Sequence, residues 1–141
     1  AYFREYKEVD NWWDSPFGAT SLEYSLPIFF DEAVTERGHS LSLLVSAMCT
    51  EPAETFGMPE KGTLEPGTDA DVVLFDPEAT YTITDEMNVS NADYTLYEGR
   101  EVTGRVTDTF VRGERVVAGG DVVGDPGHGE FLEREIPDWS A

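Results

Sequence analysis

The sequence is short of basic residues, and above all of lysine. Of its 141 residues, 29 are Asp or Glu and only 9 are Lys or Arg, so the formal net charge is −20 at pH 7. Lys7 and Lys61 are the only lysines. A surface of this charge repels phosphate backbones and anionic lipid, which argues against nucleic acid and membranes as partners. We expect adaptation to molar intracellular salt, which screens repulsion between carboxylates. The alternative is an ordinary acidic protein.

Side chains that bind metals or act as nucleophiles are scarce as well. The chain has two histidines, His39 and His128, and one cysteine, Cys49. It contains no His-x-His, His-Glu-x-x-His or Cys-x-x-Cys spacing, and no Gly-x-Ser-x-Gly turn. We therefore expect no catalytic group and no metal site formed by residues of this chain alone.

The few reactive side chains have structural interpretations. Cys49 follows an apolar helical run and is expected to be buried; it cannot form an internal disulfide, which fits a reduced, cytoplasmic setting. His39 is expected to be exposed in a loop between helices. His128, in a Pro-Gly-His-Gly turn, is expected at the surface, with a subunit contact as the alternative. Asp69 and Asp71 flank the start of a strand and are expected to cap it.

Long apolar runs are absent too. None approaches the roughly 18 residues that span a bilayer, and the N-terminus has neither a start methionine nor the apolar core of a signal peptide. We expect the chain to begin inside a longer protein. Its 40% hydrophobic and 12% aromatic content is nevertheless that of a folded domain.

The first half of the chain has helical spacing. Apolar residues recur with a helical period between Leu22 and Glu36, where Pro27 requires a helix start near Leu26 or a bend. Ser40 is a good N-cap for a helix over 41–49, and Thr50 for a second one over 51–56 that ends at Gly57.

The second half has strand spacing. Strands are predicted over 71–76, 80–84, 102–112, 114–118 and 121–123. Pro66-Gly67 predicts a turn, Asp76-Pro77 a strand end, Gly104 a bulge, and Gly113 a hairpin. The boundary between the two halves lies near Gly57 to Gly67, so the predicted class is α+β.

Five segments, in order, resemble the hydantoinase and dihydropyrimidinase family of cyclic amidohydrolases. They are Ser15–Pro27 (with Ser-Pro-Phe-Gly and Leu-Pro), Leu41–Gly57 (ending in Thr-Glu-Pro-Ala-Glu-Thr-Phe-Gly), Lys61–Pro77 (with Gly-Thr-Leu-Glu-Pro-Gly-Thr-Asp-Ala-Asp), Asp93–Val106 and Asp125–Leu132. The resemblance covers about residues 12–134. The third segment is shared by many amidohydrolases and therefore specifies the superfamily more than the substrate.

The resemblance implies the C-terminal part of an enzyme. Residues 1–60 would be the last loop and helices of a metal-dependent-hydrolase α/β barrel, 61–124 strands of a small β-sandwich, and 125–141 a tail. The whole enzyme would be a homo-oligomer, dimeric or tetrameric, with two divalent metal ions, usually zinc, bridged by a carbamylated lysine. The metal ligands and the catalytic aspartate would precede residue 1, so this chain alone would be inactive.

The resemblance also implies a substrate and a binding loop. A metal-bound hydroxide would open a hydantoin or dihydropyrimidine ring. The backbone of Phe17 and Gly18 would hold the ring amide, at a position where many hydantoinases carry asparagine. A packing role for Phe17 against Trp12 or Trp13 is the alternative. The alternative functions are an allantoinase, a dihydroorotase or a non-catalytic amidohydrolase-like subunit.

Overall fold

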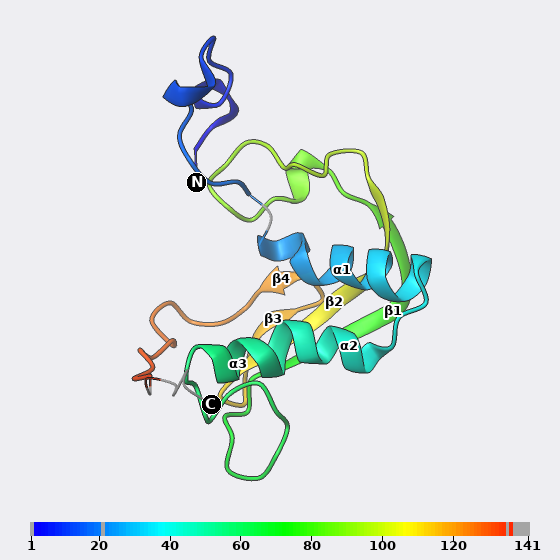
Figure 1. Cartoon of the computed structure of the whole chain (residues 1–141), viewed down its shortest axis with the longest axis vertical. Helices are drawn as coiled ribbons and strands as arrows, with labels where there is room; N and C mark the ends of the chain where they lie inside the picture. Colours follow the sequence, from blue (N-terminus) through cyan, green and yellow to red (C-terminus); the bar gives the residue numbers. More distant parts are fainter. Residues whose placement is uncertain (1, 21, 135, 137–141) are drawn as a thin grey trace.

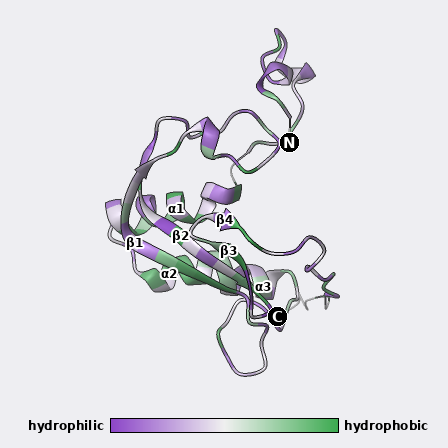
Figure 2. Ribbon diagram, turned by 180° about the vertical axis from the view of Figure 1, so that it is seen from behind, coloured by the Kyte–Doolittle hydropathy of each residue, from purple (hydrophilic) through white to green (hydrophobic). Residues whose placement is uncertain are grey.

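The structure, a computed structural model, describes residues 2–20, 22–134 and 136. These residues form a four-stranded antiparallel sheet with two helical segments across one of its faces (Figure 1). The strands are β1 (Val72–Thr82), β2 (Glu101–Val111), β3 (Glu114–Ala118) and β4 (Asp121–Val122), in that order across the sheet. Figure 2, from behind, shows the strands in front of the helices, so the helices cover a single face. An α+β arrangement is confirmed.

The β2–β3 hairpin forms where Gly113 predicted it. Val111 pairs with Glu114, and the two turn residues, Arg112 and Gly113, have φ of 49° and 80°. Positive φ at both central residues is the backbone of a type I′ turn, which matches the twist of the flanking strands. The predicted turn at Pro66-Gly67 also forms, with Gly67 at φ 104° and the Thr68 N–H donating to the Glu65 carbonyl over 3.1 Å.

Strand β1 differs from the prediction, because Asp76-Pro77 does not end it. The two strands expected over 71–76 and 80–84 are one, and its pairing with β2 shifts register between Asp76 and Thr80. Asp76 accepts the N–H of Glu78 over 2.9 Å, which turns the chain back into the sheet. Proline lacks the ladder donor and is tolerated at such an irregularity. The bulge predicted at Gly104 lies on the partner strand instead: the three extra residues belong to β1, and Gly104 of β2 is the single residue opposite them.

The first helical segment runs from Leu22 to Glu36, as the spacing predicted. It consists of a 3₁₀ turn (Leu22–Tyr24), α1 (Ser25–Phe29) and a π-helical stretch (Phe30–Glu36). Pro27 lies in the first turn of α1, where its missing N–H costs no hydrogen bond.

The second helical segment is continuous from Leu41 to Thr55, not two capped helices. It comprises α2 (Leu41–Val45), a π-helical stretch (Ser46–Thr50) and α3 (Glu51–Thr55). Ser40 is the predicted N-cap, accepting the Leu43 N–H, but Thr50 has helical angles and caps nothing. The wider π turn before Pro52 leaves room for the proline ring, which is why the helix continues.

Cys49 is exposed, so the prediction that it is buried is wrong. Within α2 only Leu44 is buried, while Leu41, Leu43 and Val45 are at least 43% exposed. The helical period was right, but the apolar face of this segment is wider than the strip that the sheet covers.

The core joins the first helical segment to the sheet. Tyr24, Ile83 and Val102 form its buried centre, flanked by Ile28, Tyr81 and Tyr97. Burial raises the pKa of Tyr24 to about 12, with the carboxylate of Glu23 adding to the shift, so the phenol stays neutral.

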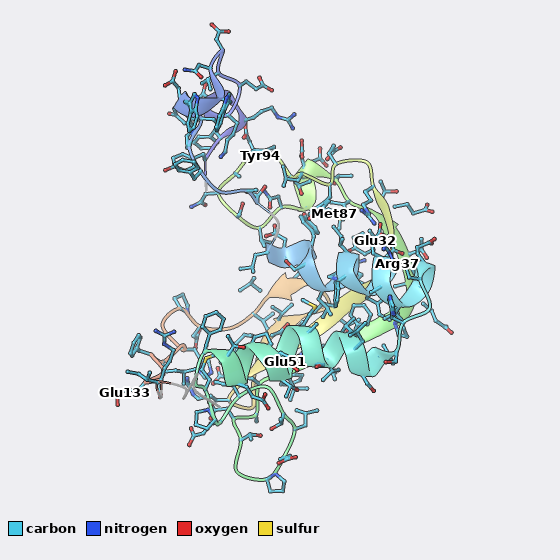
Figure 3. All side chains as sticks on the ribbon, in the orientation of Figure 1. Glu32, Arg37, Glu51, Met87, Tyr94 and Glu133 are labelled. Carbon is cyan, nitrogen blue, oxygen red and sulfur yellow. The ribbon has the colours of Figure 1, made fainter. Side chains whose placement is uncertain are left out.

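Ionic contacts fix the same helix to β2. Arg100 pairs with Glu32 and with Asp31, the latter over 3.6 Å, and the Asp31 carboxylate accepts the N–H of Thr103 over 3.1 Å. Figure 3 shows Glu32 and Arg37 on the outer end of this helix. Within the described residues, no helix is both long and apolar enough to cross a membrane.

Candidate substrate-binding loop

The loop predicted to bind substrate, Pro16 to Gly18, is held by one lysine. Lys7 Nζ donates to the carbonyl oxygen of Pro16 and, over 2.7 Å, to that of Gly18. The same ammonium group lies 5.6 Å from the centre of the Tyr2 ring. Gly18 has φ 93°, a conformation that glycine adopts without strain. The carbonyls on both sides of Phe17 are therefore fixed by a single charge.

Phe17 itself projects outward from this loop. The residue is 89% exposed, which argues against the alternative that it anchors on a tryptophan. Trp12 and Trp13 stack on each other, with ring centres 3.7 Å apart, and Asn11 caps their short 3₁₀ turn by accepting the Trp13 N–H. Among the described residues, none hydrogen-bonds to the backbone of Phe17.

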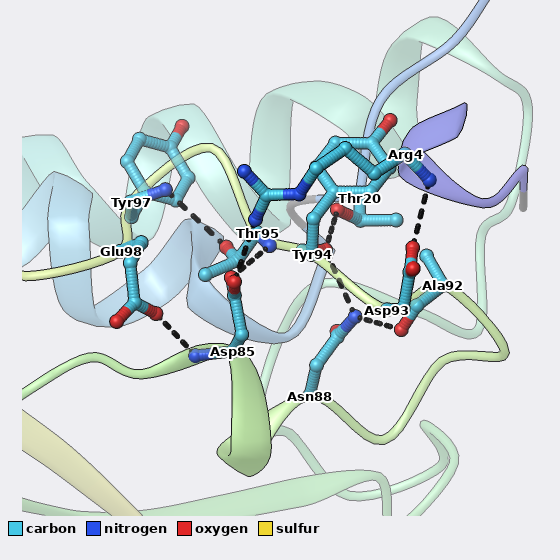
Figure 4. Close-up of polar contacts among 10 residues, drawn as sticks. All are labelled: Arg4, Thr20, Asp85, Asn88, Ala92, Asp93, Tyr94, Thr95, Tyr97 and Glu98. Atoms are coloured by element: carbon cyan, nitrogen blue, oxygen red, sulfur yellow. Dashed lines mark hydrogen bonds and ion pairs between the residues drawn. The ribbon is translucent and has the colours of Figure 1, made fainter. Parts of the chain in front are cut away.

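The end of the loop is tied to the segment between β1 and β2 (Figure 4). The buried Thr20 hydroxyl donates to the Tyr94 carbonyl over 2.8 Å. The Asn88 amide donates to the same carbonyl over 3.1 Å and to the Ala92 carbonyl over 2.9 Å. These bonds set where the loop leaves the body of the protein.

The beginning of the chain is tied to the same segment through Arg4. Its guanidinium pairs with Asp85 over 2.7 Å and lies 5.8 Å from the Tyr94 ring centre, while its backbone N–H donates to Asp93 over 2.7 Å. Asp85 in turn accepts the Thr95 N–H over 2.7 Å, so one carboxylate organises both segments (Figure 4).

The chemistry available in this loop is that of backbone amides. Phe17 has an N–H donor and a C=O acceptor that no described residue engages, and these match the C=O acceptor and N–H donor of a ring amide. The ammonium of Lys7 is occupied by carbonyl oxygens and does not face outward as a free acid. The loop can thus orient an amide substrate but has no group that activates water.

The two histidines lie apart from this loop and from each other. His39 is exposed between the helical segments, as predicted. His128 is not a free surface residue: its side chain is 20% exposed, with Nε2 3.0 Å from the Val111 carbonyl and Nδ1 3.4 Å from Glu114. It borders a hollow of about 330 Å³ between the β2–β3 hairpin and the following tail.

Asp69 and Asp71 have a structural role, although not as caps of their own strand. Lys61 bridges both carboxylates, at 2.6 Å from that of Asp69. Asp71 also accepts the N–H of Arg112 over 2.8 Å and so connects the start of β1 to the hairpin. Nowhere in residues 2–20, 22–134 and 136 do three His, Cys, Asp or Glu side chains gather in a way that could hold a metal ion.

The sequence prediction missed Lys7, Arg4, Asp85 and Thr20. The scarcity of lysine was the one feature of the sequence that could have drawn attention to Lys7. The contacts of Arg4 and Thr20 join residues more than 70 positions apart, and no local pattern predicts such pairs.

Comparison with known proteins identifies the family. The model of the amidohydrolase family matches residues 19–116. The D-hydantoinase of Streptomyces coelicolor is 39% identical over 120 residues, which is 84% of this chain and 26% of that protein. The L-hydantoinase of Paenarthrobacter aurescens is 37% identical over 123 residues, 86% of this chain and 27% of that protein.

Solved structures of a D-hydantoinase and a dihydropyrimidinase also superimpose on this chain. A D-hydantoinase from Bacillus sp. AR9 superimposes with a TM-score of 0.90 at 36% identity, over 96% of this chain and 30% of that one. The dihydropyrimidinase of Brevibacillus agri superimposes with a TM-score of 0.87 at 37% identity, over 91% of this chain and 28% of that one.

The chain belongs to the amidohydrolase family. Within it, the similar proteins named above are hydantoinases and a dihydropyrimidinase, as the five sequence segments predicted. The chain spans about a quarter of the length of these curated relatives.

Proposed function

We propose that this chain is the C-terminal part of a metal-dependent cyclic amidohydrolase that opens a hydantoin or dihydropyrimidine ring. The observation that carries the proposal is the combination of 39% identity to a D-hydantoinase over 84% of the chain with the near-complete superposition on solved hydantoinases. In this proposal residues 1–60 end an α/β barrel, 61–124 contribute strands to a small β-sandwich, and 125–141 form a tail.

The part of the reaction assigned to this chain is substrate orientation. The ring amide lies against the backbone of Phe17 and Gly18. Lys7 fixes this backbone through its hydrogen bonds to the neighbouring carbonyl oxygens. Because the contact is through the backbone, phenylalanine can replace asparagine here without loss of the hydrogen bonds. The exposed side chain of Phe17 instead influences which substituents on the substrate ring the enzyme accepts.

The metal ions do not fit the described residues of this chain, which provide no cluster of three ligands. We place the two divalent ions, the ligand histidines and the catalytic aspartate on polypeptide outside these 141 residues. The assembled enzyme is proposed to be a cytoplasmic homo-oligomer, and the isolated chain to be inactive.

A panel of cyclic amides tests the proposal. The full-length protein is incubated in molar KCl with hydantoin, dihydrouracil, allantoin and dihydroorotate, and ring opening is followed by loss of ultraviolet absorbance. Turnover of hydantoin or dihydrouracil is expected. Preference for allantoin or dihydroorotate would reassign the substrate, and no turnover by folded protein would favour a non-catalytic relative.

A further inference from the structure

We infer that Lys7 is a positioning residue for the cyclic amide, because it fixes the two carbonyl groups on either side of the Phe17 backbone. The inference rests on the proposed function and names a residue for which neither the sequence patterns nor the comparisons predict a role in substrate binding.

The partners of Lys7 are unusual for this protein. The chain has 29 carboxylates and two lysines, yet no described carboxylate lies within ion-pair distance of Lys7 Nζ. Its ammonium instead donates to the Pro16 and Gly18 carbonyls and contacts the Tyr2 ring. Lys61, by contrast, pairs with two carboxylates. Carboxylates are abundant in this chain, yet Lys7 binds neutral carbonyl oxygens. We therefore assign Lys7 the role of fixing the backbone of the loop.

The two hydrogen bonds from Lys7 also explain why the backbone groups of Phe17 remain available for a substrate. Charge-assisted hydrogen bonds are about twice as strong as neutral ones, and two of them from one ammonium close a ring through Pro16, Phe17 and Gly18. This turns the flanking carbonyls toward Lys7. The Phe17 backbone, without a partner among the described residues, is left for the substrate. Without Lys7, the loop loses its internal bonds, and the binding conformation becomes one of several.

Three variants of the full-length protein test the inference. Lys7→Met removes the charge with similar side-chain volume, Lys7→Arg keeps a cation able to donate to both carbonyls, and Arg37→Met removes one charge from an exposed site. Arg37 is a suitable control because its pair with Glu32 is 3.4 Å long and its side chain 68% exposed.

Two measurements are made on each variant: the initial rate of chymotryptic cleavage after Phe17, identified by mass spectrometry, and kcat and KM for ring opening. Lys7→Met is expected to speed this cleavage about tenfold, because a loop without its internal bonds enters the protease site more readily, and to raise KM by a similar factor with kcat less affected. Lys7→Arg should recover most of both, and Arg37→Met should match wild type.

The two possible failures are distinguishable. Unchanged cleavage after Phe17 or unchanged KM in Lys7→Met, with a wild-type protein that opens the ring, overturns the inference and leaves the proposed function intact. A wild-type protein that opens no ring overturns the proposed function, and with it the substrate role of Lys7. The cleavage rates then decide only whether Lys7 holds the loop.

Discussion

Gly104 shows how one residue fixes the contact between helix and sheet. It lies on β2 with φ 102°, and a Cβ there would come within 2.5 Å of Phe75 and 2.6 Å of Phe30. These two rings meet edge to face over it, with centres 4.8 Å apart. The absence of a side chain lets the first helical segment approach the sheet closely enough for aromatic packing.

Replacement of Gly104 should therefore cost more than backbone strain alone. Gly104→Ala is expected to lower the free energy of unfolding by about 3 kcal/mol, because overpacking adds to the cost of a positive φ. Gly67→Ala is the matched control, since Gly67 has φ 104° and a Cβ added there would have no atom within 4 Å. It should cost about 1 kcal/mol. Equal shifts of the urea midpoint in the two variants would contradict the packing argument.

The sequence predicted the roles of single residues that depend on their neighbours along the chain. It failed for residues whose environment depends on distant parts of the chain. Ser40 as N-cap and Gly113 as turn residue depend only on neighbours a few positions away. The exposure of Cys49 depends on how much of its helix the sheet covers. The candidate loop at Phe17 was found from family resemblance, whereas its support by Lys7 became visible only when the chain was folded.

Among the elements, β1 depends most on charges at its start. Lys61 bridges Asp69 and Asp71, and Asp71 also accepts the Arg112 N–H from the hairpin. Burial alone would raise the pKa of Asp71, but the hydrogen bonds from Lys61 and Arg112 outweigh it and lower the pKa. The carboxylate form of Asp71 therefore stabilises the junction of loop, strand and hairpin.

The sign of this pKa shift predicts a pH dependence. A carboxyl group with a lowered folded-state pKa contributes stability above its unfolded pKa of about 3.9, and loses it as the pH falls through the folded value. Asp71→Asn should thus lower the free energy of unfolding by about 1 kcal/mol near neutral pH. Its deficit relative to wild type should shrink as the pH is lowered through the acid range. Urea midpoints across that range check this, and a deficit that does not depend on pH would contradict it.

The elements also show where sequence patterns are insufficient. Periodicity located both helical segments and the strands, but not their continuity. By local rules Asp76-Pro77 ends a strand and Thr50-Glu-Pro begins a new helix, yet β1 and the second helical segment continue through them. In each case an irregularity, a register shift or a π turn, accommodates the proline, and packing against the rest of the fold stabilises the continuous element.

For the whole molecule, charge is the dominant property. Nine cations cannot neutralise 29 carboxylates, so the folded chain retains strong self-repulsion in dilute buffer. Salt reduces the Debye length from about 10 Å at 0.1 M to about 3 Å at 1 M, which confines repulsion to near neighbours.

We predict that the protein gains stability as KCl rises from dilute to molar concentration. The melting temperature, followed by circular dichroism, should increase through the series, while sucrose at matched osmolality should raise it less. Full stability in dilute buffer with no gain from KCl would contradict the proposed salt adaptation and favour an ordinary acidic protein.

Removal of metal tests the proposal that these residues belong to a metal-dependent cyclic amidohydrolase. Metal content and ring opening of the full-length protein are measured in molar KCl before chelation, after chelation and after addition of zinc. We expect about two ions per chain, loss of hydantoin or dihydrouracil turnover on chelation and its return with metal. Folded protein that binds no metal, or turnover that survives complete removal of the metal, would contradict the proposed function.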